Sequence, residues 1–203
     1  MKGRDEIMSL LLAFDKGYSL KKEGTGIRRL RVGLYWTAKH GNIIENLTST
    51  IDCDLSAILL KNGKFMGNDD LVYYNNLIHK SGTVKHSGDD ERGNSKFDRS
   101  DTESIILELE EMPKEYDRII LVITIKQAAE KKQCFGKIDN AAVRLVDLDY
   151  DGELCVIDLA EDYRESTAII LGEVCREVNG WKYYSKNEGL KVNSINKIAD
   201  KYI

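Results

Sequence analysis

The residues best suited to chemistry are acidic and amide side chains, which gather in four short segments between positions 52 and 103. Calcium takes about six to eight oxygen ligands from carboxylates, amide and backbone carbonyls and water. A single segment of this kind is more often a solvated turn, but carboxylates crowded together without a cation repel one another. Four of them so close together therefore favour a metal site. The segments are Asp52-Cys53-Asp54, Asn68-Asp69-Asp70, Gly88 to Gly93 (GDDERG) and Asp101-Thr102-Glu103.

The spacing of these side chains limits how they can share an ion. Alternation along a strand points Asp52 and Asp54 the same way. Asn68-Asp69-Asp70 precedes the apolar run Leu71 to Tyr74, and Asn75-Asn76 follows it. If this run is a straight strand, its polar ends lie about 17 to 20 Å apart. We therefore expect two sites, or one site and a structural amide pair.

A second acidic pattern, Asp147 to Asp158 (DLDYDGELCVID), matches the D-x-D-x-D-G form of a helix-flanked calcium loop. Its flanks are rich in β-branched residues, and Asp158 stands where such loops favour a bidentate Glu. We interpret Tyr150-Asp151-Gly152 as a hairpin turn between two strands.

Composition excludes several functional classes. The 203 residues carry a net charge of −4, which does not suit a nucleic-acid partner. The four cysteines show neither CxxC nor zinc spacing, so buried free thiols are expected. No signal peptide and no apolar run of membrane-spanning length is visible, so we expect a cytoplasmic protein. The histidines lack metal or catalytic spacing, and only His86, beside an acidic segment, is a candidate base.

The apolar pattern predicts a mainly β fold. About nine short strands separated by turn residues are typical of a sandwich or a barrel. Asn62-Gly63 and Asn179-Gly180 have the chemistry of type I′ hairpin turns. A short helix is expected over Lys126 to Gln133, and a C-terminal helix over Val192 to Ile203 should dock its apolar stripe on the sheet. The predicted strands are Arg31 to Leu34, Ser56 to Leu60, Leu71 to Tyr74, Ser104 to Leu109, Arg118 to Ile125, Ala142 to Val146, Leu154 to Leu159, Ala168 to Arg176 and Trp181 to Ser185.

Several motifs, in order along almost the whole chain, resemble the TerD family of bacterial tellurium-resistance and general stress proteins. They are DCDLSAILLKNGK, NDDLVYYNN, VKHSGDDERG, VITIKQAAEKKQCFGKIDNAAVRLV, DLAEDYRESTAIILGEV and NGWKY. The resemblance implies one two-sheet β-sandwich domain over 1–203, with 1–7 as an extension. It also implies a cytoplasmic stress protein associated with resistance to tellurite and other toxic agents.

The same resemblance implies a set of calcium ligands, and with the spacing of the segments we expect two ions. Thr37 and Thr102 stand where the family usually has acids, which lowers the expected charge of one site. The expected partners are other proteins of a stress-resistance complex, with any membrane association peripheral and made through them. The predicted ligands are Asp52, Asp54, Asn68, Asp69, Asp70, Asn75, Asn76, Asp89, Asp90, Asp101 and Glu103.

The main functional hypothesis is a non-enzymatic calcium-binding module whose ions fix loops and create a surface for partners. The alternative is a metal-dependent hydrolase that uses the carboxylates to hold Mg²⁺, with His86 or a spare carboxylate as base. A metal-free interaction protein is a third hypothesis. Direct reduction of tellurite by the cysteines is disfavoured by their apolar settings.

Overall fold

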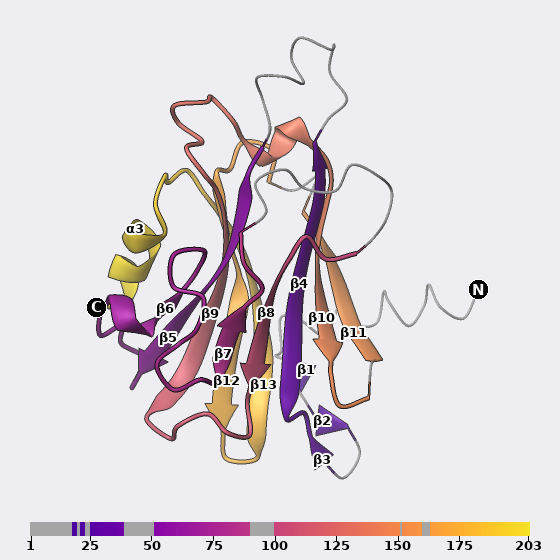
Figure 1. Ribbon diagram of the computed structural model, residues 1–203, viewed down its shortest axis with the longest axis vertical. Helices are drawn as coiled ribbons and strands as arrows, with labels where there is room; N and C mark the ends of the chain where they lie inside the picture. The colour runs from indigo at the N-terminus through magenta and orange to yellow at the C-terminus, as the bar shows by residue number, and fades with distance from the viewer. Residues whose placement is uncertain are drawn as a thin grey trace, which may run out of the picture.

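The computed structural model describes residues 18–19, 21–22, 25–38, 51–89, 100–150, 152–159 and 163–203. Two antiparallel sheets pack face to face, as Figure 1 shows, which confirms the predicted two-sheet β-sandwich. A two-stranded ribbon of β2 (Lys21–Lys22) and β3 (Thr25–Gly26) is separate from both. The larger sheet contains, in spatial order, β1 (Tyr18–Ser19), β13 (Gly180–Leu190), β12 (Ala168–Glu177), β9 (Tyr116–Ile125), β5 (Cys53–Lys61) and β6 (Leu71–Val72). The second sheet contains β11 (Gly152–Asp158), β10 (Ile138–Asp147), β4 (Arg29–Ala38), β8 (Glu103–Glu108) and β7 (Val84–His86).

The main core lies between the sheets. The register pairs Leu55 with Ile123 and Ile123 with Ile169, so one row of branched side chains crosses three strands of the larger sheet. These residues belong to one buried cluster with Val32 of β4 and Val143 of β10. Interdigitation of the two inner faces is how aligned sandwiches bury their apolar surface.

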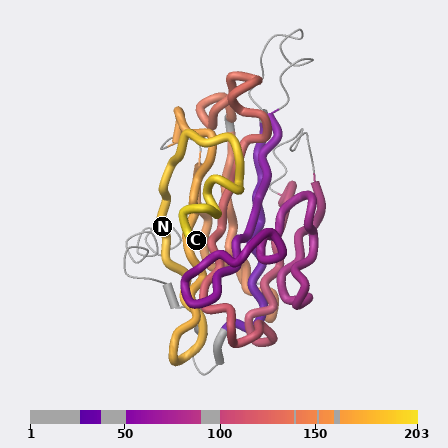
Figure 2. The backbone as a smooth tube through the Cα atoms, turned by 90° about the vertical axis from the view of Figure 1, so that its left-hand side faces the viewer, coloured from indigo at the N-terminus to yellow at the C-terminus, as the bar shows by residue number. Residues whose placement is uncertain are grey.

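A second core lies on the outer face of the larger sheet, beneath the C-terminal helix α3 (Ile195–Ala199) and the 3-10 helix η4 (Asp200–Tyr202). Figure 2 is viewed from the side on which this helix crosses the sheet. Ile198 is fully buried against Ile58 and Ile120, so the predicted docking of an apolar stripe is confirmed. The helix begins later than predicted, after Ser194, whose side chain caps it by accepting a hydrogen bond from the Asn196 N–H.

One predicted element is wrong, and another is shorter than predicted. The segment Lys126 to Gln133 forms turns and no helix, with left-handed φ values of 56° at Gln127 and 51° at Lys132. The run Leu71 to Tyr74 continues as a strand only to Val72. Tyr73 and Asn76 then exchange two backbone hydrogen bonds and turn the chain back, so the expected straight strand with distant polar ends does not exist.

The hairpin predictions are largely confirmed. Asn62 and Gly63 both have left-handed φ, 52° and 73°, as a type I′ turn requires. Strands β10 and β11 form an antiparallel hairpin, so the acidic pattern at Asp147 is flanked by strands as predicted. In the β12–β13 hairpin the turn is one residue earlier than predicted, at Val178-Asn179, and Gly180 already begins β13.

Candidate functional site

The register brings the start of β5 and the end of β9 together at one end of the sandwich, the upper end in Figure 1. Cys53 points into the main core, so strand alternation turns Asp52 and Asp54 to the other side. Asp89 approaches the same place from the segment that follows β7. Asp52, Asp54 and Asp89 each contribute a carboxylate oxygen, and these three oxygens lie within 4.8 Å of one another. We call these residues the aspartate cluster.

Two members of the aspartate cluster are deeply buried. Asp52 is 4% exposed and Asp54 3%, whereas Asp89 is exposed. Oδ1 of Asp52 and Oδ1 of Asp54 have no hydrogen-bond partner. A buried carboxylate oxygen without a partner is costly unless a cation or donor satisfies it. The donor set therefore fits an oxygen-preferring divalent cation.

Burial and mutual repulsion perturb the titration of these carboxyl groups. Burial, followed by the charges of Asp52 and Glu103, raises the pKa of Asp54 from 3.8 to about 8. Burial also raises the pKa of Asp52, although Lys126 opposes the rise. Such raised values are expected where carboxylates are brought together in a dry site without enough positive charge.

Lys126, the first residue after β9, provides part of that charge. Its Nζ lies 3.2 Å from Oδ2 of Asp52, 3.3 Å from Oδ2 of Asp89 and 4.7 Å from the ring centroid of Tyr74. Its backbone N–H donates to the carbonyl of Asp52 over 2.9 Å. Burial lowers the pKa of Lys126, but the two aspartates outweigh burial and raise it above its ordinary value.

Glu103 and His86 support the strand that carries the cluster. Oε2 of Glu103 accepts the Leu55 N–H over 2.9 Å, and Nε2 of His86 donates to the Leu55 carbonyl over 3.0 Å. Nδ1 of His86 accepts the Gly88 N–H over 3.0 Å, which orients the segment leading to Asp89. Both side chains are fully buried. They act as orienting groups beside the cluster.

The remaining predicted ligands lie elsewhere or outside the described residues. Asp70 is buried and bonded to Tyr116 Oη (2.7 Å), Lys80 Nζ (2.9 Å) and His79 Nε2 (3.3 Å). Burial raises its pKa, but these three partners outweigh burial and the pKa is lowered. Asp70 is thus a satisfied structural carboxylate.

Asp101 is also engaged in ion pairs. It faces Arg144 and lies 3.4 Å from Nε of Arg31, in space that the missing side chain of Gly33 leaves open. Asn76 donates from its amide to the Leu71 carbonyl over 2.7 Å. The structure therefore brings three of the eleven predicted ligands together, with Glu103 supporting them. Asn68, Asp69 and Asn75 are exposed, and Asp90 is outside the described residues.

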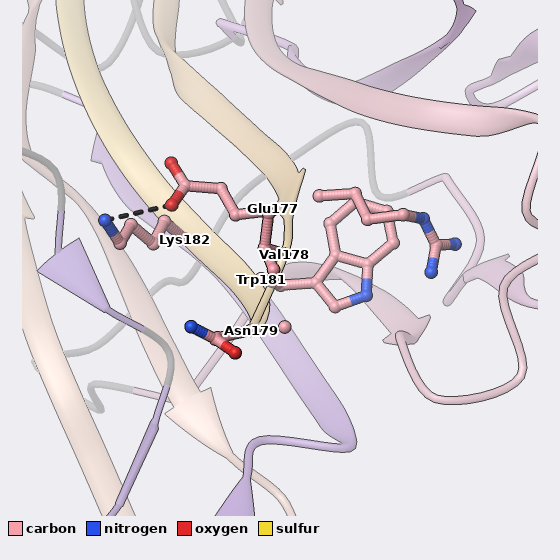
Figure 3. Close-up of a pocket in the computed structure, with 7 residues that line it drawn as sticks. Glu177, Val178, Asn179, Trp181 and Lys182 are labelled. Carbon is pink, nitrogen blue, oxygen red and sulfur yellow. Dashed lines mark ion pairs between the residues drawn. The ribbon is translucent and has the colours of Figure 1, made fainter.

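A pocket of about 650 Å³ opens at the other end of the sandwich, around the β12–β13 hairpin (Figure 3). Its charged side chains already have partners. The Arg176 guanidinium donates to three backbone carbonyls and stacks on Trp181, and Glu177 pairs with Lys182 over 3.0 Å. The pocket therefore presents no convergent set of open polar groups.

Lys126 and Tyr74 are the site residues that sequence reasoning missed. One signal was available for Lys126, since a lysine directly ends the apolar run of β9. It could be used only by assuming that this strand pairs with the one that starts beside Asp52.

The chain is similar to known proteins over most of its length. A family model described as the TerD domain matches residues 8–202. The chain is 36% identical over 183 residues to the tellurium resistance protein TerD of Serratia marcescens, covering 90% of this chain and 91% of that protein. It is 31% identical over 202 residues to the stress response protein SCP2 of Bacillus subtilis (strain 168), covering 96% and 100%.

A solved structure supports the fold. The crystal structure of a homologue of telluride resistance protein (TerD) from Streptomyces coelicolor A3(2) matches with a TM-score of 0.71 at 18% identity, over 88% of this chain and 99% of that one. Within the described residues, no helix has the length and apolar character needed to span a membrane.

Proposed function

Since the chain belongs to the TerD family, a family of tellurium-resistance and stress-response proteins, we propose that it acts in that response as a calcium-binding, non-enzymatic interaction module. The ion would be held by Asp52, Asp54 and Asp89, with water and backbone carbonyls completing the oxygen ligands that calcium requires. The observation that carries the proposal is the pair of buried, unpartnered oxygens on Asp52 and Asp54.

Calcium suits the aspartate cluster better than zinc or copper, because the donors are all carboxylate oxygens and include no imidazole or thiolate. Two ligands come from the rigid start of β5 and one from the segment after β7, so binding would join these two parts of the sandwich. The resulting surface is the part of the molecule that we expect a protein partner to contact. The second ion expected from the spacing of the acidic segments stays a prediction.

Two observations favour a non-enzymatic role over the alternatives. A hydrolase would need a general base beside the metal, but both ring nitrogens of His86 are already hydrogen-bonded and its side chain is buried. Burial raises the pKa of the Cys155 thiol to about 12 and that of Cys175 to about 11. Both thiols therefore hold their protons at neutral pH and are poor reductants of an oxyanion.

The proposal is tested by calorimetric titration of chelator-treated protein with Ca²⁺ and with Mg²⁺, and by thermal melts under the same conditions. Binding to the native state alone adds about 2.7 kcal/mol to the free energy of unfolding at a hundredfold excess over Kd. Asp54→Asn should abolish the effect, whereas Asp69→Asn, which changes an exposed aspartate of the 3-10 helix η2 (Asn68–Asp70), should not. Absence of calcium binding, or equal stabilisation by Mg²⁺, would refute the proposal.

A further inference from the structure

Lys126 occupies, with its own positive charge, the place where the proposed cation would bind. Its ammonium group makes ion pairs with two of the three members of the aspartate cluster, Asp52 and Asp89. These are the carboxylates that the proposed cation would also require. An ammonium group and a divalent cation on the same carboxylates repel each other strongly at such short range.

The ammonium group is held in place from several sides. Its side chain is only 26% exposed, and the Tyr74 ring lies against the charged end at 4.7 Å. A cation over an aromatic face is attracted by the ring. The backbone of Lys126 is fixed by its hydrogen bond to Asp52 at the point where β9 ends. The lysine is therefore part of the built structure and is not a freely moving surface side chain.

The ammonium group does not satisfy the whole cluster. Oδ1 of Asp52 and Oδ1 of Asp54 have no hydrogen-bond partner although the lysine is present. One monovalent donor thus offsets part of the negative charge of three carboxylates. A divalent cation would offset more of it, which gives the cation a thermodynamic reason to replace the lysine.

We infer that Lys126 is a built-in competitor of the divalent cation at the aspartate cluster. Its ammonium group stabilises the cluster until calcium binds, and calcium binds by displacing it from Asp52 and Asp89. The lysine lowers calcium affinity and thereby sets the concentration at which the site fills. This inference rests on the proposed function, because it concerns the regulation of the same site.

Competition also links the site to the turns that follow β9. Lys126 begins the segment of turns that continues through Lys132, so release of its side chain frees an anchor of that segment. Calcium binding therefore changes the environment of this segment as well as that of the carboxylates. Calcium binding and release of the Lys126 side chain can therefore be measured in separate experiments.

The first test is calorimetric titration of the chelator-treated full chain with CaCl₂, comparing wild type, Lys126→Met, Lys126→Arg and Lys131→Met. Removal of one close like charge should lower the Kd of Lys126→Met at least about tenfold, equivalent to roughly 1.4 kcal/mol. Lys126→Arg keeps the charge and can pair with the carboxylates at least as well, so it should not lower the Kd below that of wild type. Lys131→Met removes an exposed lysine of the same turns and should leave the Kd unchanged.

The second test uses unaltered protein, so it does not depend on the folding of a variant. Lysines are acetylated with acetic anhydride in chelator and in saturating Ca²⁺, and the extent at each position is measured by mass spectrometry. An ammonium group released from two ion pairs is more accessible to the reagent, so Lys126 should react at least about threefold faster with calcium. Lys131 serves as the internal control, with an unchanged rate.

The outcomes separate this inference from the proposed function. If wild type and Lys131→Met bind calcium but Lys126→Met binds no more tightly, or if Lys126 acetylation is unaffected by calcium, the competitor role is overturned and the calcium site stands. If none of the four proteins binds calcium, the proposed function fails, and the inference fails with it.

Discussion

Replacing Asp54 with Asn should stabilise the protein in the presence of a chelator, because Asp54 must take up a proton when the protein folds at neutral pH and an asparagine need not. The native pKa of Asp54 is about 8, against 3.8 for an ordinary Asp. Between these values the native state binds a proton that the unfolded state has released, so stability falls as pH rises. At about 1.36 kcal/mol per pH unit, the cost is about 4 kcal/mol at pH 7 and about 1.7 kcal/mol at pH 5.

The asparagine has nearly the same shape and no charge to lose, but its amide N–H groups need acceptors, which takes back part of the gain. We therefore expect Asp54→Asn to exceed wild type by about 2 to 4 kcal/mol at pH 7 and by clearly less at pH 5. Urea unfolding in chelator at the two pH values measures the difference, with Asp69→Asn as the control that should stay within about 0.5 kcal/mol of wild type. Calcium at a hundredfold excess over Kd should reduce the variant's advantage by about 2.7 kcal/mol, because only the wild type binds the ion.

Two results would refute this reasoning. One is a variant less stable than wild type at both pH values, which would mean that the Asp54 carboxylate makes a favourable contact in the native state. The other is a stability difference that does not change between pH 5 and pH 7, which would mean that Asp54 titrates normally.

Three further substitutions test the scaffold, each by urea unfolding. Tyr116→Phe removes the 2.7 Å hydrogen bond to the buried carboxylate of Asp70 and should cost about 1 to 3 kcal/mol; an unchanged free energy of unfolding would show that the other donors suffice. Gly172→Ala places a methyl group 2.4 Å from the backbone oxygen of Tyr184 and should cost about 1 to 3 kcal/mol, so a loss below about 0.5 kcal/mol would contradict the close approach. Ile198→Ala empties part of the core beneath the C-terminal helix and should cost about 2 to 4 kcal/mol without altering calcium affinity; a weaker affinity would show that the helix and the site are coupled.

The strands could be predicted because each one is recognisable from its own short run of β-branched and apolar residues. The run Ile119 to Ile123 lacks the alternation of a half-exposed strand, and the structure supplies the reason. One face of β9 meets the second sheet and the other meets the C-terminal helix, so both faces are apolar. Such a run still predicts a strand through its β-branched content.

The helix over Lys126 to Gln133 was predicted from propensities of a few tenths of a kcal/mol per residue, which tertiary structure readily overrides. Here Ala128 is buried, and Gln127 adopts a left-handed φ that no helix allows. The turn at Tyr73 was missed for a similar reason. Its aromatic residues favour a strand, but Asn75 and Asn76 supply turn chemistry that outweighs them.

The members of the aspartate cluster could be selected from the sequence by residue type, but only partly by position. Asp52 and Asp54 could be paired from strand alternation, but their junction with Asp89 depends on how two sheets meet, which no local pattern contains. Asp70 shows the limit of composition most clearly. It looks like a ligand in the sequence, but it lies in the core with three partners of its own.

The backbone of Leu55 is hydrogen-bonded to side chains and not to a neighbouring strand, which affects how this edge of the sheet can associate with other molecules. Strand β6 pairs only with Ala57 and Ile58, so the first part of β5 has no strand neighbour on that side within the described residues. An open edge of this kind can recruit a strand from another molecule and begin aggregation. Here Glu103 accepts the Leu55 N–H and His86 donates to the Leu55 carbonyl. An incoming strand would need these same two backbone groups. The same two side chains that orient the aspartate cluster therefore also protect this edge of the sandwich from edge-to-edge association.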